Sequence, residues 1–285
     1  MTVSGNRIKR TRAQIAVAAV LVVSACAPMA HRDGSVGGSS ADMIRVGDVA
    51  RDAGDPAVAL PHYQRAYRLD PENMVAIIRI GETFNQLGAY NEAGDAWSRI
   101  LLLEPRNFDA LVGYGNTLTA LHQPIAALEY FERSQQFGTT AAQLNGMGVA
   151  HDMAGNAIQA QDSYRMGLKM DPDSLKMSNN LGLSLALSGG YSEAIRLLEA
   201  AAEMPGAGVR HRQNLALAYG MAGFTERAAT VGRRDLDDVS VRRNIEFYRM
   251  IAGMRDHAAK VAAVGARTNG TFPTGALAIQ SATTR

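Results

Sequence analysis

The sequence predicts an all-α solenoid of about six helix pairs, and two columns of small residues carry this prediction. A small residue recurs every 33 or 34 positions in the first column: Gly47, Gly81, Gly115, Gly148, Gly182 and Ala216. An alanine recurs with the same spacing in the second column: Ala59, Ala93, Ala127, Ala160, Ala194 and Ala228. Small side chains are needed where the two helices of a hairpin cross closely, and stacked hairpins bury one continuous core.

The repeating unit is clearest in residues 74–107. Its first half places apolar residues such as Ile80 and Phe84 on one helical face, which predicts an amphipathic helix. The pattern breaks at Gly88, and a second amphipathic run follows. Pro105 ends that run, because proline has no backbone N–H to donate to a helix. Neither helix can bury its apolar stripe alone, so the unit needs neighbours.

The period and the residue pattern resemble the tetratricopeptide repeat. A bulky residue stands four positions after five of the column alanines, at Tyr63, Trp97, Phe131, Tyr164 and Leu198. Prolines close three of the units, at Pro71, Pro105 and Pro172. The resemblance implies helix pairs stacked into a superhelical solenoid.

In this interpretation the repeats fill residues 40–238. The expected boundaries are 40–73, 74–107, 108–140, 141–174, 175–208 and 209–238. The sixth repeat departs from the pattern, because Gly232 stands where an aromatic residue usually packs. One long helical run, residues 239–266, is expected to cap the last apolar face. A tail rich in Thr, Gly, Ala and Ser, residues 267–285, is expected to be disordered.

The first 25 residues have the character of an export signal. A basic segment is followed by a short apolar run that ends in Val-Ser-Ala before Cys26. This resembles the lipobox of bacterial lipoproteins, which implies lipidation of Cys26. The small and polar residues that follow predict a flexible tether over residues 26–39. The alternatives are an ordinary cleaved signal peptide or a signal anchor. Because the next residue is Ala27 rather than aspartate, the resemblance favours the periplasmic face of the outer membrane, with the inner membrane still possible.

Charge and cysteine content exclude several function classes. The chain has a net charge of +2, and residues 1–25 contribute four positive and no negative side chains. Without that segment the net charge is −2, which gives no basic footprint for nucleic acid. Cys26 is the only cysteine, so neither a disulfide within the chain nor a thiolate metal cluster is expected.

No residue pattern predicts an enzyme, a metal site or a cofactor. The histidines are scattered, at His31, His62, His122, His151, His211 and His257, without the spacing of metal ligands. We interpret His151 as a packed core residue rather than a ligand. No glycine-rich phosphate loop follows a strand, and no nucleophile is paired with a base.

Solenoids of this kind bind protein partners along the face formed by the first helix of each pair. A helical wheel places on this face mixed aliphatic, amide and charged residues that suit an extended or helical peptide. They are Val75, Ile78, Glu82, Asn85, Asp109, Asn116, Asn145, Lys176, Asn179, Asn180, Arg210 and Asn214. Lys176, Asn180 and Asn214 have some of the spacing of repeats that clamp a C-terminal carboxylate. The alternative is that these asparagines are structural, since asparagine before Leu-Gly is common in such repeats.

The last repeat carries a more specific resemblance. Residues 213–250 read QNLALAYGMAGFTERAATVGRRDLDDVSVRRNIEFYRM, which is similar to the C-terminal part of the TadD family of Flp (tight adherence) pilus assembly lipoproteins. The resemblance implies a non-enzymatic scaffold that helps to assemble the pilus secretion machine, with the secretin channel or its neighbours as partners. Two alternatives remain: a general scaffold for outer-membrane protein or exopolysaccharide assembly, and an enzyme with a solenoid domain. The repeats leave little room for a catalytic domain.

Overall fold

The structure is a computed structural model that describes residues 38–268. The expected export signal, Cys26 and most of the expected tether lie outside the described residues, as does the tail from residue 269 onwards. The described part contains only α-helices and loops. Its helices are α1 (Ser40–Asp52), α2 (Pro56–Leu69), α3 (Met74–Gln86), α4 (Tyr90–Leu103), α5 (Phe108–Ala120), α6 (Pro124–Gln135), α7 (Ala141–Met153), α8 (Ala157–Met170), α9 (Leu175–Ser188), α10 (Tyr191–Glu203), α11 (Val209–Met221), α12 (Thr225–Gly232), α13 (Asp238–Ala252) and α14 (His257–Thr268).

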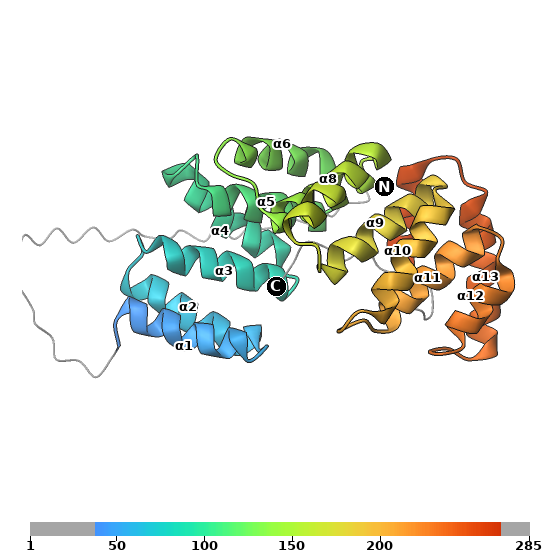
Figure 1. Ribbon diagram of the computed structural model, residues 1–285. Helices are drawn as coiled ribbons and strands as arrows, with labels where there is room; N and C mark the ends of the chain where they lie inside the picture. Colours follow the sequence, from blue (N-terminus) through green and yellow to red (C-terminus); the bar gives the residue numbers. More distant parts are fainter. Residues whose placement is uncertain (1–37, 269–285) are drawn as a thin grey trace, which may run out of the picture. The chain divides into compact units, whose positions relative to one another are not determined.

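The first twelve helices form six antiparallel pairs, one in each predicted repeat (Figure 1). Each helix packs against the next along the chain, and the first helix of each pair also contacts the first helix of the following pair. Side-chain caps start many of these helices. Asn73 and Asn107 accept hydrogen bonds from backbone N–H groups in the first turns of α3 and α5. The predicted all-α repeat solenoid is therefore confirmed.

The columns of small residues lie where the helices of a pair touch. A Cβ atom added at Gly81 would lie 2.7 Å from the ring of Trp97, and one at Gly148 would lie 2.3 Å from the ring of Tyr164. The large residue of the second helix thus fills the space that the glycine of the first helix leaves. In the sixth pair both positions are small, with Ala216 on α11 and Gly232 on the short helix α12, and a Cβ atom added at Gly232 would lie 3.3 Å from Val241 of α13.

The turn between the two helices of a pair needs a left-handed residue. Glycine takes this conformation in five pairs, for example Gly88 with φ 75°. In the third pair His122 takes it with φ 58°, although a side chain makes this conformation unfavourable.

We expect the substitution His122→Gly to raise the free energy of unfolding by about 0.5–1 kcal/mol, because relief of the strained φ outweighs the added flexibility of glycine. Urea unfolding followed by circular dichroism measures the change. Gly88→His is the reciprocal variant and should lower stability. Equal stability of all three proteins would show that the turn conformation carries no strain.

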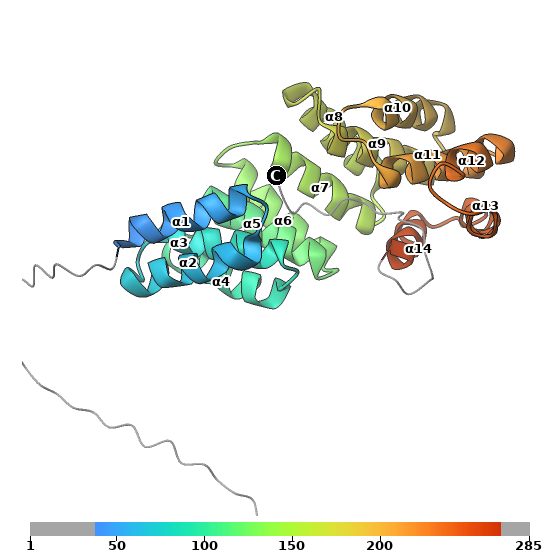
Figure 2. The same ribbon diagram turned by 90° about the horizontal axis from the view of Figure 1, so that it is seen from below.

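The C-terminal region differs from the expectation in one respect. The single helix expected over residues 239–266 is two helices, α13 and α14, separated at Gly253–Asp256. Helix α13 packs against α11 and α12, and the ring of Tyr248 lies against Gly220. It therefore covers the end of the repeat array. Helix α14 instead returns to α7 and α9, where its polar contacts reach residues 105 and 73 positions earlier in the chain (Figure 2).

Candidate protein-binding surface

The first helices of the pairs, α3, α5, α7, α9 and α11, form a surface that we call the A-helix face. Its α3 and α5 part is open to solvent. The side chain of Val75 is 48% exposed, Ile78 and Asn116 are partly exposed, and Asp109 is exposed. A protein partner can therefore reach aliphatic, amide and carboxylate groups along these two helices.

A charge network lies beside this open part. Arg79 forms salt bridges with Glu82 at 2.9 Å and with Asp48 of α1 at 3.0 Å. Arg51 also binds Asp48, at 3.0 Å. Glu82 is thus held by an arginine and is still 39% exposed at its side chain, so it remains available to a partner.

Five predicted asparagines on this face are buried and bind neighbouring repeats. Asn180 donates to Asn145 at 3.0 Å, and Asn214 donates to Asn179 at 2.9 Å. Asn85 accepts a hydrogen bond from Thr117 at 2.9 Å. The exposed fractions are 5% or less for Asn85, Asn145, Asn179, Asn180 and Asn214. These contacts favour the structural interpretation of the asparagines over a carboxylate clamp, since two clamp members bind other amides.

Lys176 and Arg210, the two basic candidates on this face, lie in the first turns of α9 and α11 and are partly exposed. Burial lowers the pKa of the Lys176 ammonium from 10.5 to about 8. No salt bridge to Lys176 occurs within the described chain. The folded protein therefore disfavours the charged form of this side chain.

This pKa shift predicts that stability rises with pH. Between about pH 8 and 10.5 the unfolded chain holds a proton on Lys176 that the folded chain has lost, so deprotonation favours folding in this window. We expect urea unfolding to show wild type gaining stability relative to Lys176→Met as the pH rises from 8 to 10. A difference between the two proteins that stays constant with pH would contradict the shift.

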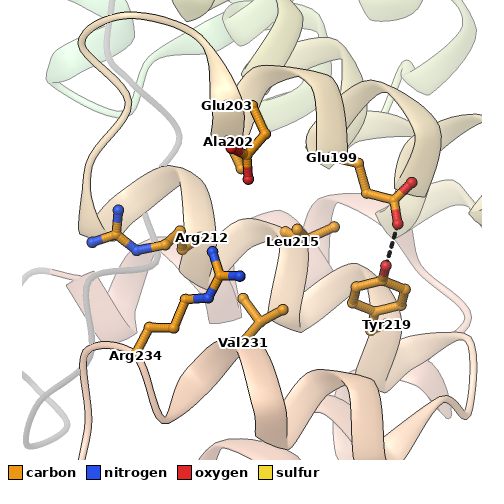
Figure 3. Close-up of a pocket in the computed structure, with 8 residues that line it drawn as sticks. All are labelled: Glu199, Ala202, Glu203, Arg212, Leu215, Tyr219, Val231 and Arg234. Carbon is orange, nitrogen blue, oxygen red and sulfur yellow. Dashed lines mark hydrogen bonds between the residues drawn. The ribbon is translucent and has the colours of Figure 1, made fainter.

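A separate hollow of about 210 Å³ lies among α10, α11 and α12 (Figure 3). The hydroxyl of Tyr219 points to Glu199 and donates a hydrogen bond to its carboxylate. The hollow lies beside α12, which is only 8 residues long. The other lining residues are Ala202, Glu203, Arg212, Leu215, Val231 and Arg234. Its volume is below the range of about 300–1,000 Å³ typical of small-molecule sites.

The described residues contain no group of three or more His, Cys, Asp and Glu side chains that could hold a metal ion. His151 is partly buried, and burial lowers its pKa, as a packed histidine requires. In the described part of the chain, every helix is too short or too polar to cross a membrane.

The sequence gives no sign that the carboxylate of Asp152, near the end of α7, is buried. Asp152 is 2% exposed and accepts hydrogen bonds from Tyr164 at 3.0 Å and from Ser184 at 2.6 Å. Nε2 of His257 in α14 lies 2.8 Å from the same carboxylate. One side chain thus joins both helices of the fourth pair to α9 and α14. Asp152 is buried in part by α14, which is distant in the sequence. This burial occurs in one repeat alone, so it leaves no pattern that recurs along the chain.

Comparisons with known proteins agree with this architecture. Residues 46–102 and 146–209 match a family model described as a tetratricopeptide repeat. The fold is similar to the crystal structure of PilW, a widely conserved type IV pilus biogenesis factor, at 15% identity and a TM-score of 0.64, over 73% of this chain and 97% of that chain. Pseudomonas aeruginosa pilF has 15% identity and a TM-score of 0.59, over 74% and 96% of the two chains.

A tetratricopeptide repeat protein from Parabacteroides merdae ATCC 43184 is similar as well, at 15% identity and a TM-score of 0.58, over 74% of this chain and 84% of that chain. Comparison with curated proteins gives no significant match. At these identities the solved structures show the fold. Together with the two matched segments, they show that the described part of the chain has the fold of a tetratricopeptide-repeat solenoid.

Proposed function

We propose that the protein is a non-enzymatic scaffold that binds protein partners along its A-helix face. The observation that carries the proposal is the open part of this face on α3 and α5, where Val75 and Asp109 are exposed and Ile78 is partly exposed. Extended surfaces of this kind are what repeat solenoids use to bind other proteins. Mixed aliphatic and acidic side chains suit a peptide with apolar and basic residues.

The partner belongs to the assembly machinery of the Flp (tight adherence) pilus, most directly the secretin channel or a subunit beside it. The resemblance of residues 213–250 to the TadD family supports this assignment. The fold similarity to PilW, a type IV pilus biogenesis factor, is consistent with a role in pilus assembly. Lipidation of Cys26 anchors the scaffold at the periplasmic face of the outer membrane, and the lipobox-like sequence before Cys26 supports the anchor.

A pull-down from detergent-solubilised envelope with the tagged protein tests the proposal. We expect recovery of a secretin or another pilus-secretion subunit, and reduced recovery with the variant Cys26→Ser, which should also leave the membrane fraction. Recovery of only outer-membrane insertion or polysaccharide-export components would instead support a general envelope scaffold. A clean deletion should abolish surface Flp pili, and normal piliation would refute the pilus role.

A further inference from the structure

Helix α14 is seated on the A-helix face like a bound ligand. It contacts α7 and α9, whereas the chain enters it through a short break at Gly253–Asp256 after α13. Asp256 caps its first turn by accepting hydrogen bonds from the N–H groups of Ala258 and Ala259, each at 3.2 Å. A four-residue linker therefore connects α14 to α13, and α14 begins with its own side-chain cap.

The residues that hold α14 lie on one side of it. His257, Lys260, Val261 and Val264 are spaced at i, i+3, i+4 and i+7, which places them on a single helical face. Val261 and Val264 are 4% and 0% exposed and join the apolar core that includes Val149, Leu183 and Leu187. By contrast, Ala262 is exposed. Helix α14 thus has the amphipathic pattern of a helix bound in a groove.

The surface of α7 and α9 that α14 covers, which we call the seat, is electronegative at the end that contacts the polar side chains of α14. Asp152 lies in the last turn of α7 and Leu187 in the last turn of α9, so the negative ends of two helix dipoles meet there. Nε2 of His257 lies 2.8 Å from the Asp152 carboxylate. The ammonium of Lys260, a residue only 8% exposed, donates to the carbonyl oxygen of Leu187 at 2.9 Å. This carbonyl is one of those that a helix end leaves without an intrahelical partner.

We infer that the α7–α9 part of the A-helix face is a groove for an amphipathic helix, and that α14 occupies it as a displaceable internal ligand. The partner helix that fits the groove carries an imidazole or another N–H donor at i, an ammonium at i+3, and small aliphatic side chains at i+4 and i+7. Because α14 is tethered by a short linker, its effective concentration is about millimolar, and an external helix binds well only after α14 leaves. A weakly binding helix therefore cannot displace α14 from the groove. A partner displaces it only if it binds the groove strongly enough to compete with the tethered α14.

The probe for this inference is a labelled synthetic peptide of residues 256–268. In the full-length protein, Val264→Asp places a charge in the apolar seat and should release α14, whereas Ala262→Asp adds the same charge on the exposed side. We expect the peptide to bind Val264→Asp at least about tenfold more tightly than wild type or Ala262→Asp. The reason is that the apparent affinity for the peptide is reduced in proportion to the fraction of molecules in which α14 has left the groove. Fluorescence anisotropy measures the binding.

Two further measurements keep the test decisive. A peptide with Lys260→Glu should lose most of this binding, because a carboxylate would face the carbonyl end of α9. Hydrogen exchange should show faster exchange of α14 amides in Val264→Asp than in Ala262→Asp, while α1 to α6 remain protected. If Val264→Asp unfolds beyond α14, the milder Lys260→Ala variant in the full-length protein serves in its place.

The inference would be overturned if hydrogen exchange showed α14 released in folded Val264→Asp, yet the peptide bound this variant as weakly as it binds wild type and Ala262→Asp. A wild-type dimer whose α14 is protected only in the dimer would also overturn it, since the occupant would then be a second copy. The inference rests on the proposed function, because that function makes the partner a protein. The two proposals are nevertheless tested by separate experiments, and either can fail without the other. The peptide assay needs no pilus component, and the envelope pull-down can succeed through the open α3–α5 part alone.

Discussion

Replacing Trp97 with alanine is expected to lower the free energy of unfolding by about 3–5 kcal/mol. The Trp97 side chain on α4 is 2% exposed. Its ring lies against two glycines, because Cβ atoms added at Gly81 and Gly113 would lie 2.7 Å and 2.6 Å from it. Since neither glycine has a side chain that can move into the vacated space, the cavity should remain largely open. The loss therefore lies at the large end for a core truncation.

Urea unfolding of Trp97→Ala and wild type measures this loss, with circular dichroism as the signal. Leu102→Ala is the matched control, because Leu102 lies on the same helix and is 83% exposed. It should change stability by less than about 0.5 kcal/mol. A Trp97→Ala protein as stable as the control would show that the second and third helix pairs do not depend on this ring.

Asp152→Ala should cost about 3 kcal/mol or more, because it leaves buried polar groups without an acceptor. The hydroxyls of Tyr164 and Ser184 both donate to this carboxylate, and both residues are at most 1% exposed. The contact from His257 at 2.8 Å is lost as well. We therefore expect both a lower free energy of unfolding and faster hydrogen exchange in α14.

Asp162→Ala provides the comparison for this variant, since Asp162 lies in the same repeat with a side chain that is 65% exposed. Its removal should leave unfolding and exchange close to wild type. If Asp152→Ala behaved like Asp162→Ala in both measurements, Asp152 would not connect the fourth pair, α9 and α14 as the structure indicates.

The repeat architecture could be predicted from sequence because close helix crossings leave a periodic record. Gly81 and Gly148 are small for the same reason, and Trp97 and Tyr164 are large for the complementary reason. Each contact recurs at the same offset within a repeat, so the sequence alone reveals it.

The candidate site could be predicted only in part. A helical wheel places Val75 and Asn180 on the same face, but the contact of Asn180 with Asn145 of the preceding repeat decides that Asn180 is buried. The position of α14 could not be predicted. Its hydrogen-bond contact with α7 joins residues 105 positions apart, and no other repeat in the described chain has an equivalent contact that would leave a periodic pattern. The break at Gly253 and the cap at Asp256 were the local signals that two helices follow α12.

Site-specific photocrosslinking in cells that make Flp pili tests most directly whether the A-helix face binds the partner. A photoreactive amino acid replaces Val75 on α3 in one strain and Leu102 on α4 in another, because both side chains reach solvent, at 48% and 83% exposure. We expect the Val75 position to give a crosslink to a pilus-secretion subunit and the Leu102 position to give none. A crosslink from Leu102 without one from Val75 would contradict binding along the A-helix face.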